Sequence, residues 1–512
     1  MKTIIKRPTV FLLTILVPFW LFIFLTYKDF GISWDEEADY KSGQFYLENF
    51  LAPPNVVSQN VSVIHQLSHG ALTDMIYFLP QKIFNPTDFY EVLHLTKALA
   101  SSLTIVFIFL ALQLITKSKP VSLAGAILII FFPRWLGDIF DNHMDATATI
   151  FYALEILLAV KILTTAELKS KLNWLIGLAV FAGISFSHRP ALITVPFITI
   201  PLTAWQMRNL KVTWSKMLTS LFLFVLIFYI SLYMVDPYTR AYGPISIISK
   251  LTSSANFTYY VGAQLFAGEY YYAKDFPAAY LPVWILITTP IITLLFFILG
   301  TFALIKNLFS KTRQPKLISL LLLSAFFGPL FLVVILRPIF YNAWRHLLFL
   351  SAPLVIIAAV GFGQLIQKRF NFLKTLAITA LILNVLFTSK AYWQLHPYQY
   401  LYFNSLVGGL QNAYHYYETD YWAKTNKDAV SYLRQNVLDP TKTYKIGLCA
   451  SEITSLYYFS ANMVWERKKQ NADYLICVTR LSAHELVTNP NTIYVVKRQD
   501  APLNYIEKVK KQ

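Results

Sequence analysis

Apolar runs of about twenty residues recur along this chain from residue 9 to residue 388, separated by short connectors that carry lysine and arginine. A helix of that length is what crosses the roughly 30 Å hydrocarbon core of a bilayer. Only 14% of the 512 residues are charged, whereas a typical soluble domain has about 25%. The sequence therefore predicts an α-helical polytopic membrane protein.

We expect about eleven membrane-spanning helices. The first is expected to stay in the protein, because its apolar run is too long for a signal peptide and no small-residue cleavage site follows it. The expected spans are 9–27, 93–116, 120–137, 146–163, 173–187, 190–206, 216–235, 281–305, 317–336, 345–365 and 371–388.

Basic residues concentrate in alternate connectors. The opposite connectors hold little beyond Arg189, Arg337 and Arg345. By the positive-inside rule the N-terminus is cytoplasmic, and an odd number of spans places the C-terminal tail outside. The net charge of +17 thus reflects topology and does not indicate a nucleic-acid partner. The basic set is Lys2, Lys6, Arg7, Lys117, Lys119, Lys169, Lys171, Arg208, Lys211, Lys216, Lys306, Lys311, Arg313, Lys316, Lys368, Arg369 and Lys374.

Two units are expected: a membrane module, 1–388, with long outer loops at 28–92 and 236–280, and an extracytoplasmic domain, 389–512. In this domain a helix-like segment, 425–438, precedes strand-like segments at 444–449, 474–478 and 492–497, which predicts a small α/β fold. The two cysteines, Cys449 and Cys477, are either a disulfide of an oxidising compartment or two buried thiols, and the sequence leaves both readings open.

An acidic cluster follows the first span directly: Asp35, Glu36, Glu37 and Asp39. Like charges at the edge of a low-dielectric region oppose one another's ionisation. A solvated acidic loop is the alternative. The position beside an apolar span favours a site that holds a metal ion, a general base, or both.

A second acidic cluster, Asp138, Asp141, His143 and Asp145, lies in the outer turn between the third and fourth spans. Asp145 stands where a helix N-terminus favours a carboxylate, so an N-cap is one interpretation. The other is a divalent-cation site on Asp141, His143 and Asp145, suited to Mg²⁺ or Mn²⁺ rather than zinc. The spacing matches no strict metal motif, so the sequence leaves open whether a divalent cation takes part.

Four basic residues stand at outer connectors, against the topological bias: His188, Arg189, Arg337 and Arg345. A guanidinium there can clamp a phosphate, whereas the alternative is a side chain that snorkels to the interface. Carboxylates and arginines on one membrane face suit transfer of a sugar from a lipid-linked phosphate. A carboxylate removes the acceptor's proton, and the arginines stabilise the departing phosphate.

Several motifs in order then support a family resemblance. They are Asp35-Glu36; Pro133-Arg134 with Phe140-Asp141-Asn142-His143-Met144-Asp145, in which His143-Met144 replaces a Pro-Lys pair; Arg345-His346-Leu347-Leu348; and the tail stretch from His396-Pro397-Tyr398 to Asp420-Tyr421-Trp422. With these motifs the chain resembles the GT-C superfamily of membrane glycosyltransferases, in particular the dolichyl-phosphate-mannose protein mannosyltransferase-like group, glycosyltransferase family 39.

The resemblance implies an inverting enzyme that uses a polyprenyl-phosphate-linked sugar on the outer face. Asp35 would be the general base, Glu36 would orient the acceptor or the base, and Asp145 would shape the site. Arg345 and Arg189 would bind the phosphate. The acceptor hydroxyl is left open. A transporter or lipid flippase, which would place ionisable groups near mid-membrane, and a non-catalytic assembly subunit are the alternatives.

Overall fold

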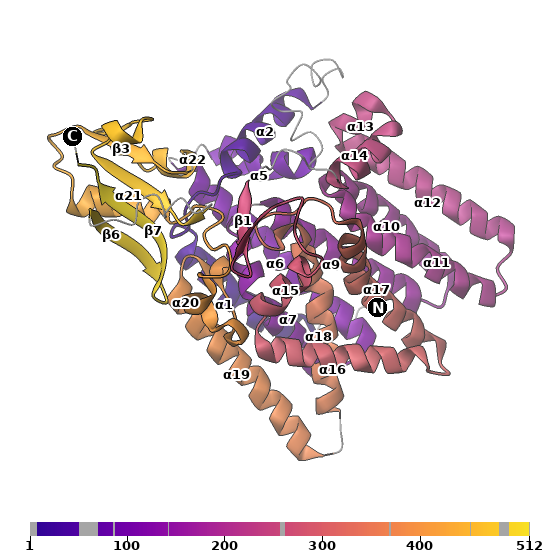
Figure 1. Cartoon of the computed structure of the whole chain (residues 1–512). Helices are drawn as coiled ribbons and strands as arrows, with labels where there is room; N and C mark the ends of the chain where they lie inside the picture. Colours follow the sequence, from indigo (N-terminus) through magenta and orange to yellow (C-terminus); the bar gives the residue numbers. More distant parts are fainter. Residues whose placement is uncertain are drawn as a thin grey trace.

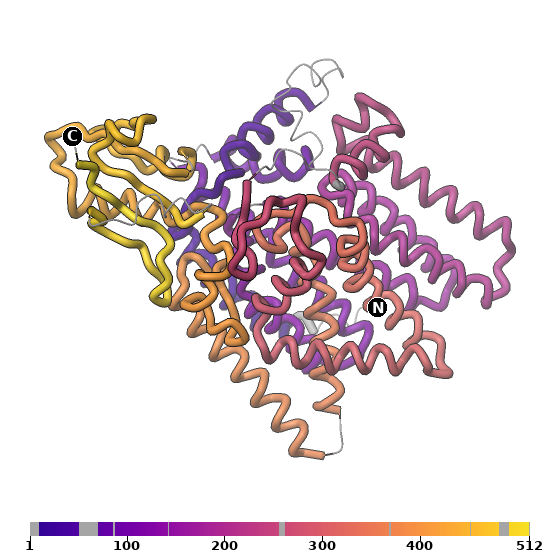
Figure 2. Tube along the Cα trace, viewed as in Figure 1, coloured from indigo at the N-terminus to yellow at the C-terminus, as the bar shows by residue number. Residues whose placement is uncertain are grey.

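The computed structural model describes residues 8–50, 70–84, 86, 88–141, 143–255, 262–367, 370–450, 452–480 and 491–510. Long helices make up a bundle, and the strands of a small C-terminal sheet gather at its left side in Figure 1. The tube in Figure 2 carries the chain from an N-terminal helix within the bundle to a C-terminus at the far side of the sheet.

Nine helices in the described part of the chain are long and apolar enough to cross a membrane. Two shorter apolar helices, α1 (Pro8–Thr26) and α7 (Lys119–Ile130), fall on the first and third predicted spans. The predicted helical membrane fold is therefore confirmed, without fixing how many helices cross. The nine are α6 (Phe89–Thr116), α9 (His143–Thr164), α10 (Leu168–His188), η1 with α11 (Pro190–Ile193, Thr194–Asn209), α12 (Trp214–Val235), α16 (Ile291–Leu308), α17 (Arg313–Leu336), η2 with α18 (Arg345–Leu350, Ser351–Ile366) and α19 (Asn371–Leu395).

Prolines divide two of the predicted spans. Pro290 separates α15 (Tyr280–Thr288) from α16, so the predicted span 281–305 is not one helix. The predicted span 120–137 ends at Ile130, and Pro133 opens the short helix α8 (Pro133–Asp138). Proline has no N–H and its ring clashes with the preceding turn, which ends a helix or starts a new one. Because of this break, Asp138 is the last residue of the buried helix α8, and Asp141 lies in the buried bend that follows it.

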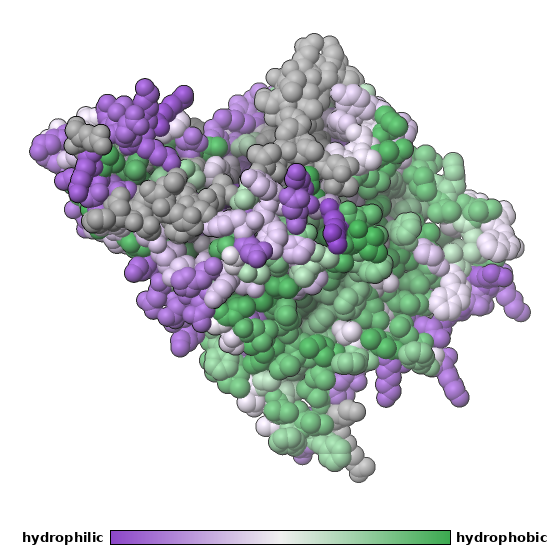
Figure 3. Space-filling model, viewed as in Figure 1, coloured by the Kyte–Doolittle hydropathy of each residue, from purple (hydrophilic) through white to green (hydrophobic). Residues whose placement is uncertain are grey.

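Helix α9 lies at the centre of the bundle. In α9, 83% of the most apolar stretch is buried inside the protein, and the same share is buried in η2–α18. The corresponding share is 22% in α12 and 17% in α19. The outer helices therefore present apolar side chains outward, and these form the green surface of Figure 3. His143 and Asp145 of the second acidic cluster stand in the first turn of α9 and are therefore carried by one of the two most buried long helices of the described chain.

The described parts of the two expected outer loops contain helices and a β-hairpin. The first contains α2 (Glu36–Asn49) and α5 (Ala71–Phe84), and the second contains α13 (Pro237–Tyr242), α14 (Ile245–Ala255) and the hairpin β1–β2 (Ala263–Phe266, Glu269–Tyr272). Helices α2, α5, α13 and α14 lie at the same, upper end of the bundle in Figure 1. Pro53, Pro54, Tyr259 and Tyr260 of the expected loops lie outside the described residues.

The tail forms a five-stranded mixed sheet in the order β4-β3-β5-β7-β6. Strands β4 (Met463–Trp465), β3 (Tyr444–Leu448) and β5 (Tyr474–Val478) are parallel, while β7 (Ala501–Lys508) runs antiparallel to β5 and β6 (Thr492–Arg498). Helix α21 (Asn426–Asn436) packs on the sheet. The predicted helix and three strands are confirmed. The remaining short helices are η3 (Gln399–Leu401), η4 (Ser405–Val407), α20 (Gly409–Ala413), α22 (Ile453–Leu456) and η5 (Lys469–Asn471).

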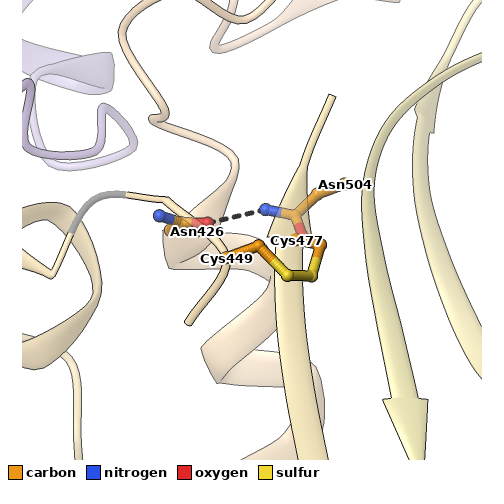
Figure 4. Close-up of a disulfide and its surroundings, with 4 residues drawn as sticks. All are labelled: Asn426, Cys449, Cys477 and Asn504. Atoms are coloured by element: carbon orange, nitrogen blue, oxygen red, sulfur yellow. Dashed lines mark hydrogen bonds between the residues drawn. A yellow bond between two sulfur atoms is a disulfide. The ribbon is translucent and has the colours of Figure 1, made fainter. Parts of the chain in front are cut away.

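A disulfide joins the two cysteines, which the sequence left open. Cys449 follows β3 and Cys477 lies in β5, the neighbouring parallel strand. Beside the bond, the Asn504 side-chain amide donates a 2.7 Å hydrogen bond to Oδ1 of Asn426 (Figure 4). The bond and this hydrogen bond tie the sheet to itself and to α21.

Candidate active site

Glu36, in the first turn of α2, is completely buried. Its Oε1 lies 2.6 Å from Nζ of Lys97 and 2.9 Å from Nε2 of His94, both on α6, and its Oε2 accepts from the Ser33 N–H at 2.6 Å. Burial would raise the pKa of Glu36, but the charges of Lys97 and His94 outweigh it and hold the pKa below its ordinary value. Glu36 is therefore a fixed anion that anchors α2 to the bundle.

Asp39, one turn further along α2, faces His143 at the start of α9. Its Oδ2 lies 3.2 Å from Nδ1 of His143, whose Nε2 lies 2.7 Å from Oδ1 of Asp74 on α5. Ser42 donates to the other oxygen of Asp74 at 2.5 Å. Burial raises the pKa of Asp39 although His143 opposes the shift. This network fixes the second turn of α2 against α5 and α9.

Asp35, at the N-cap position of α2, differs from both neighbours. Its side chain is 41% exposed, and its Oδ2 lies 3.6 Å from Nη1 of Arg345. Glu36 and Asp39 face buried basic groups, and Glu37 pairs with the exposed Lys41. Asp35 is the exposed carboxylate of this turn that lies beside Arg345.

Asp145 is buried between two arginines. Arg189 Nη2 lies 2.6 Å from its Oδ1, and Arg345 Nη1 lies 3.2 Å from its Oδ2. Arg189 caps the C-terminal end of α10 and donates also to the carbonyl of His346 at 2.6 Å. The Asp145 carboxylate thus binds two guanidiniums that come from distant parts of the chain. The Arg345 guanidinium also lies beside Asp35.

Aromatic rings border the Arg345 guanidinium. Its Cζ lies 4.6 Å from the ring centroid of Trp422 and 4.9 Å from that of Tyr341. Burial raises the pKa of the Tyr341 hydroxyl against the opposing charge of Arg345, so this phenol stays neutral. The rings restrict where the guanidinium can move and remove it from bulk water.

The tail reaches into the second acidic cluster. Lys424 forms an ion pair with Asp141, and the Trp422 indole N–H points to Oδ1 of Asp138 at 3.4 Å. Burial raises the pKa of Asp141 to about 6 although Lys424 opposes the shift. Burial, with Asp141 and Asp145 nearby, raises the pKa of Asp138 well above its ordinary value. Trp422 and Lys424 of the tail therefore contact the second acidic cluster directly.

The segment that leads to Asp35 is also held by the tail. Lys427 Nζ on α21 donates to three successive carbonyls, of Lys28 at 2.7 Å, Asp29 at 3.1 Å and Phe30 at 3.2 Å. The Ile32 N–H donates to the Tyr458 hydroxyl at 2.9 Å. Two further contacts are those of His396 with Asp29, at 2.8 Å, and of Arg480, whose Cζ lies 5.0 Å from the Trp34 ring centroid.

The predicted metal set Asp141, His143 and Asp145 is not brought together. Asp141 faces Lys424, His143 faces Asp39 and Asp74, and Asp145 faces the two arginines. Across the described residues, no group of three histidine, cysteine or acidic side chains could hold a metal ion. The three side chains stay apart because Asp141 precedes α9, while His143 and Asp145 point from its first turn to different neighbours.

Two predicted phosphate residues lie apart from the arginine pair. Both ring nitrogens of His188 have protein neighbours: Nε2 lies 2.8 Å from the Met144 carbonyl and Nδ1 lies 3.0 Å from the Thr73 hydroxyl. Arg337 caps α17 and is exposed. Within the described parts of the chain, no ion pair or hydrogen bond joins Arg337 to Asp145 or Asp35.

Sequence reasoning missed Lys97 and Lys424, the cations that neutralise Glu36 and Asp141. Lys97 had a signal, since it stands within the predicted span 93–116 and a charge at that depth needs a partner. Lys424 had none, because a lysine in a soluble tail is ordinarily solvated.

No protein-family model matches this chain, and a search of curated proteins finds no match. Among solved structures, ArnT from Cupriavidus metallidurans in the apo state is 12% identical, with 97% of both chains covered and a TM-score of 0.48. The same protein bound to undecaprenyl phosphate is 11% identical, covering 86% of this chain and 88% of that one, with a TM-score of 0.46.

The oligosaccharyltransferase of Archaeoglobus fulgidus, in complex with zinc and sulfate, is 12% identical over 80% of this chain and 59% of that one, with a TM-score of 0.37. Glycosyltransferase family 39 is not confirmed by these matches.

Proposed function

We propose that this chain is an inverting membrane glycosyltransferase of the GT-C type, which transfers a sugar from a polyprenyl-phosphate carrier to an acceptor hydroxyl. The observation that carries the proposal is the exposed carboxylate of Asp35 beside two guanidiniums that share the buried carboxylate of Asp145. A proton acceptor and an anion site next to each other are what such a transfer requires. The ordered sequence motifs of the GT-C resemblance support the same reaction.

Arg189 and Arg345 are the proposed phosphate-binding residues. Two guanidiniums on one carboxylate leave positive charge at the site, and a guanidinium binds phosphate oxygens through parallel hydrogen bonds. Asp145 acts as a positioning residue that holds both side chains in one place. In the complex, the donor phosphate takes the place of Asp35 as the second anion at Arg345.

Asp35 is the proposed general base. The acceptor oxygen attacks the anomeric carbon while the bond from that carbon to the phosphate oxygen breaks, and Asp35 takes the hydroxyl proton. The negative charge that moves to the polyprenyl phosphate is stabilised by Arg345 and Arg189. A single displacement inverts the configuration at the anomeric carbon, and Glu36 contributes by anchoring α2 and not by contact with the acceptor.

We also propose an orientation of the protein in the membrane. The N-terminus lies in the cytoplasm, and the site and the tail, 389–512, lie on the opposite face of the membrane module, 1–388. The connector charges support this orientation. The Cys449–Cys477 disulfide supports it independently, because structural disulfides persist in oxidising compartments.

The purified full-length protein, reconstituted with a panel of polyprenyl-phosphate sugars and hydroxyl acceptors, tests the function. We expect release of free polyprenyl phosphate, followed by ³¹P NMR, together with a glycosylated product. The transporter alternative predicts a different result: movement of a fluorescent polyprenyl-phosphate sugar between leaflets without product. Leaflet exchange without bond cleavage would contradict the proposal.

A further inference from the structure

Helices α10 and α12 cross closely at one point. A Cβ atom at Gly183 of α10 would lie 2.5 Å from the Phe228 carbonyl oxygen and 2.8 Å from the Leu232 nitrogen of α12. Glycine is therefore required for the backbones to approach this far, as is common between membrane helices. The crossing lies near the end of α10 that carries His188 and Arg189.

The two helices separate toward their N-terminal ends and leave a hollow between them. Its volume is about 660 Å³, a size typical of ligand pockets. Its charged and amide lining comes from Lys169 and Asn173 on α10 and from Lys216 on α12, in the first turns of each helix, and the hydroxyls of Thr219 and Ser220 follow on α12. Because α10 has 21 residues and a helix rises about 1.5 Å per residue, this end lies roughly 30 Å from the arginine pair.

Positive charge gathers at the mouth of this hollow. Lys169 and Lys216 belong to two helices that both begin here, so two helix N-termini add partial positive charge to two ammonium groups. Glu167, the nearest acidic residue in sequence, accepts a 2.6 Å hydrogen bond from Ser170. In the described part of the chain neither Lys169 nor Lys216 forms an ion pair, although the Glu167 carboxylate stands at the start of the helix that carries Lys169.

The interior of the hollow is apolar. Leu172 and Ile176 of α10 line it together with Leu223 and Phe224 of α12, one to two turns further along the helices. The Thr219 and Ser220 hydroxyls donate to carbonyls of their own helix. From Lys216 to Leu223 the helix advances by about 10 Å. Hydrophilic residues reappear around the loop between α11 and α12 at the right-hand rim of Figure 3, beyond the green apolar surface. The order from basic mouth to apolar interior follows the order from headgroup to acyl chain in a lipid.

We propose that this wedge between α10 and α12 binds one anionic phospholipid. Its phosphate lies between Lys169 and Lys216, and one acyl chain fills the apolar interior. The site is separate from the arginine pair and does not depend on the proposed glycosyl transfer. Charge complementarity selects the headgroup, since each basic side chain near an anionic lipid surface adds roughly five-fold to binding.

Native mass spectrometry of the delipidated full-length protein in detergent tests the site. Dioleoylphosphatidylglycerol is the anionic probe and dioleoylphosphatidylcholine the zwitterionic one. We expect one retained phosphatidylglycerol per chain, and roughly 25-fold weaker binding in the K169Q/K216Q double variant. The matched control is K211Q, in the same loop region but outside the hollow, which should bind as the wild type does.

A second variant tests the hollow without changing charge. Ile176→Trp fills the apolar interior and should weaken binding of both lipids, while the lysines remain. Equal binding of the two lipids by the wild type, or undiminished phosphatidylglycerol binding by the double variant, would overturn the headgroup assignment. Displacement of the lipid by millimolar inorganic phosphate alone would overturn a lipid site in favour of a free-anion site.

Discussion

Arg345 Nη1 lies 3.6 Å from Oδ2 of Asp35, so the exposed carboxylate at the start of α2 faces the guanidinium of the first residue of η2, a helix far along the sequence. The same nitrogen lies 3.2 Å from Asp145. One side chain therefore joins the proposed base to the proposed phosphate site. In the proposed mechanism, a phosphate bound at Arg345 takes the place of Asp35 as the partner of that guanidinium.

Asp35→Asn tests the base. We expect the rate of transfer to fall by about 10²–10⁴-fold, because the amide cannot accept the acceptor's proton. Donor binding should persist, since both arginines remain. The measurement is single-turnover product formation, with donor affinity determined separately by fluorescence.

The control is Glu37→Gln on the same helix. Glu37 pairs with the exposed Lys41 at 2.5 Å and points away from the site network. We expect near-normal transfer. Activity retained by Asp35→Asn, or lost equally in Glu37→Gln, would show that the base lies elsewhere.

Arg345→Gln tests the phosphate site, with Arg345→Lys as the variant that keeps Asp145 paired. We expect kcat/KM for the donor to fall by about 10²–10³-fold, because a positioned donor to the developing charge is lost. Arg337→Gln removes an exposed arginine outside the pair and should match the wild type. A loss in Arg337→Gln as large as that in Arg345→Gln would return Arg337 to the phosphate site.

Lys427→Met tests whether the hydrogen bonds from the tail stabilise the segment that precedes Asp35. Three carbonyl contacts to residues 28–30 disappear with the ammonium. We expect amide hydrogen exchange in residues 28–35 to speed up by about ten-fold or more, since a hydrogen bond to a charged group contributes roughly 1.5–3 kcal/mol.

Two comparisons make the exchange experiment specific. Lys442→Met removes an exposed lysine of the same tail, paired at 3.5 Å with Asp439, and should leave residues 28–35 unchanged. Lys427→Arg should restore much of the protection. Unchanged exchange in Lys427→Met would mean that the bundle alone fixes the segment.

Glu36→Gln tests the buried anion through pH. At pH 7 we expect a loss of about 3–5 kcal/mol in the free energy of unfolding, because Lys97 is left without its partner. The folded-state pKa of Glu36 lies below the ordinary 4.5, so its contribution is complete above that value and is lost as the pH falls through the folded-state pKa.

The difference in the free energy of unfolding between the wild type and Glu36→Gln should therefore become smaller as the pH drops below about 4.5. Thermal unfolding in detergent from pH 7 to pH 3.5 measures it. Glu37→Gln serves again as the control and should show a small difference at every pH, as expected for an exposed ion pair. A gap that stays constant into acid would contradict the assignment of the charge on Glu36.

Much of the helical framework could be predicted because membrane helices follow from local composition. Runs of apolar residues identified the segments that became α6, α9 and α12. The tail's helix and three strands were equally readable from their patterns. Strands β4 and β7 were not, since β4 has three residues and β7 contains Pro502 and alternates irregularly.

The sequence by itself predicted that acidic and basic residues meet at one end of a helical bundle. Hydropathy identifies the helices, and the charges of the connectors indicate which connectors share a face of the membrane. Tertiary structure alone decided which of these charges are paired. Asp35, Glu36 and Asp39 look alike in the sequence, yet Glu36 pairs with Lys97, Asp39 faces His143, and Asp35 lies beside Arg345 with its side chain 41% exposed. The physical reason is that burial and partner distance set the state of a carboxylate, and both come from residues far away along the chain.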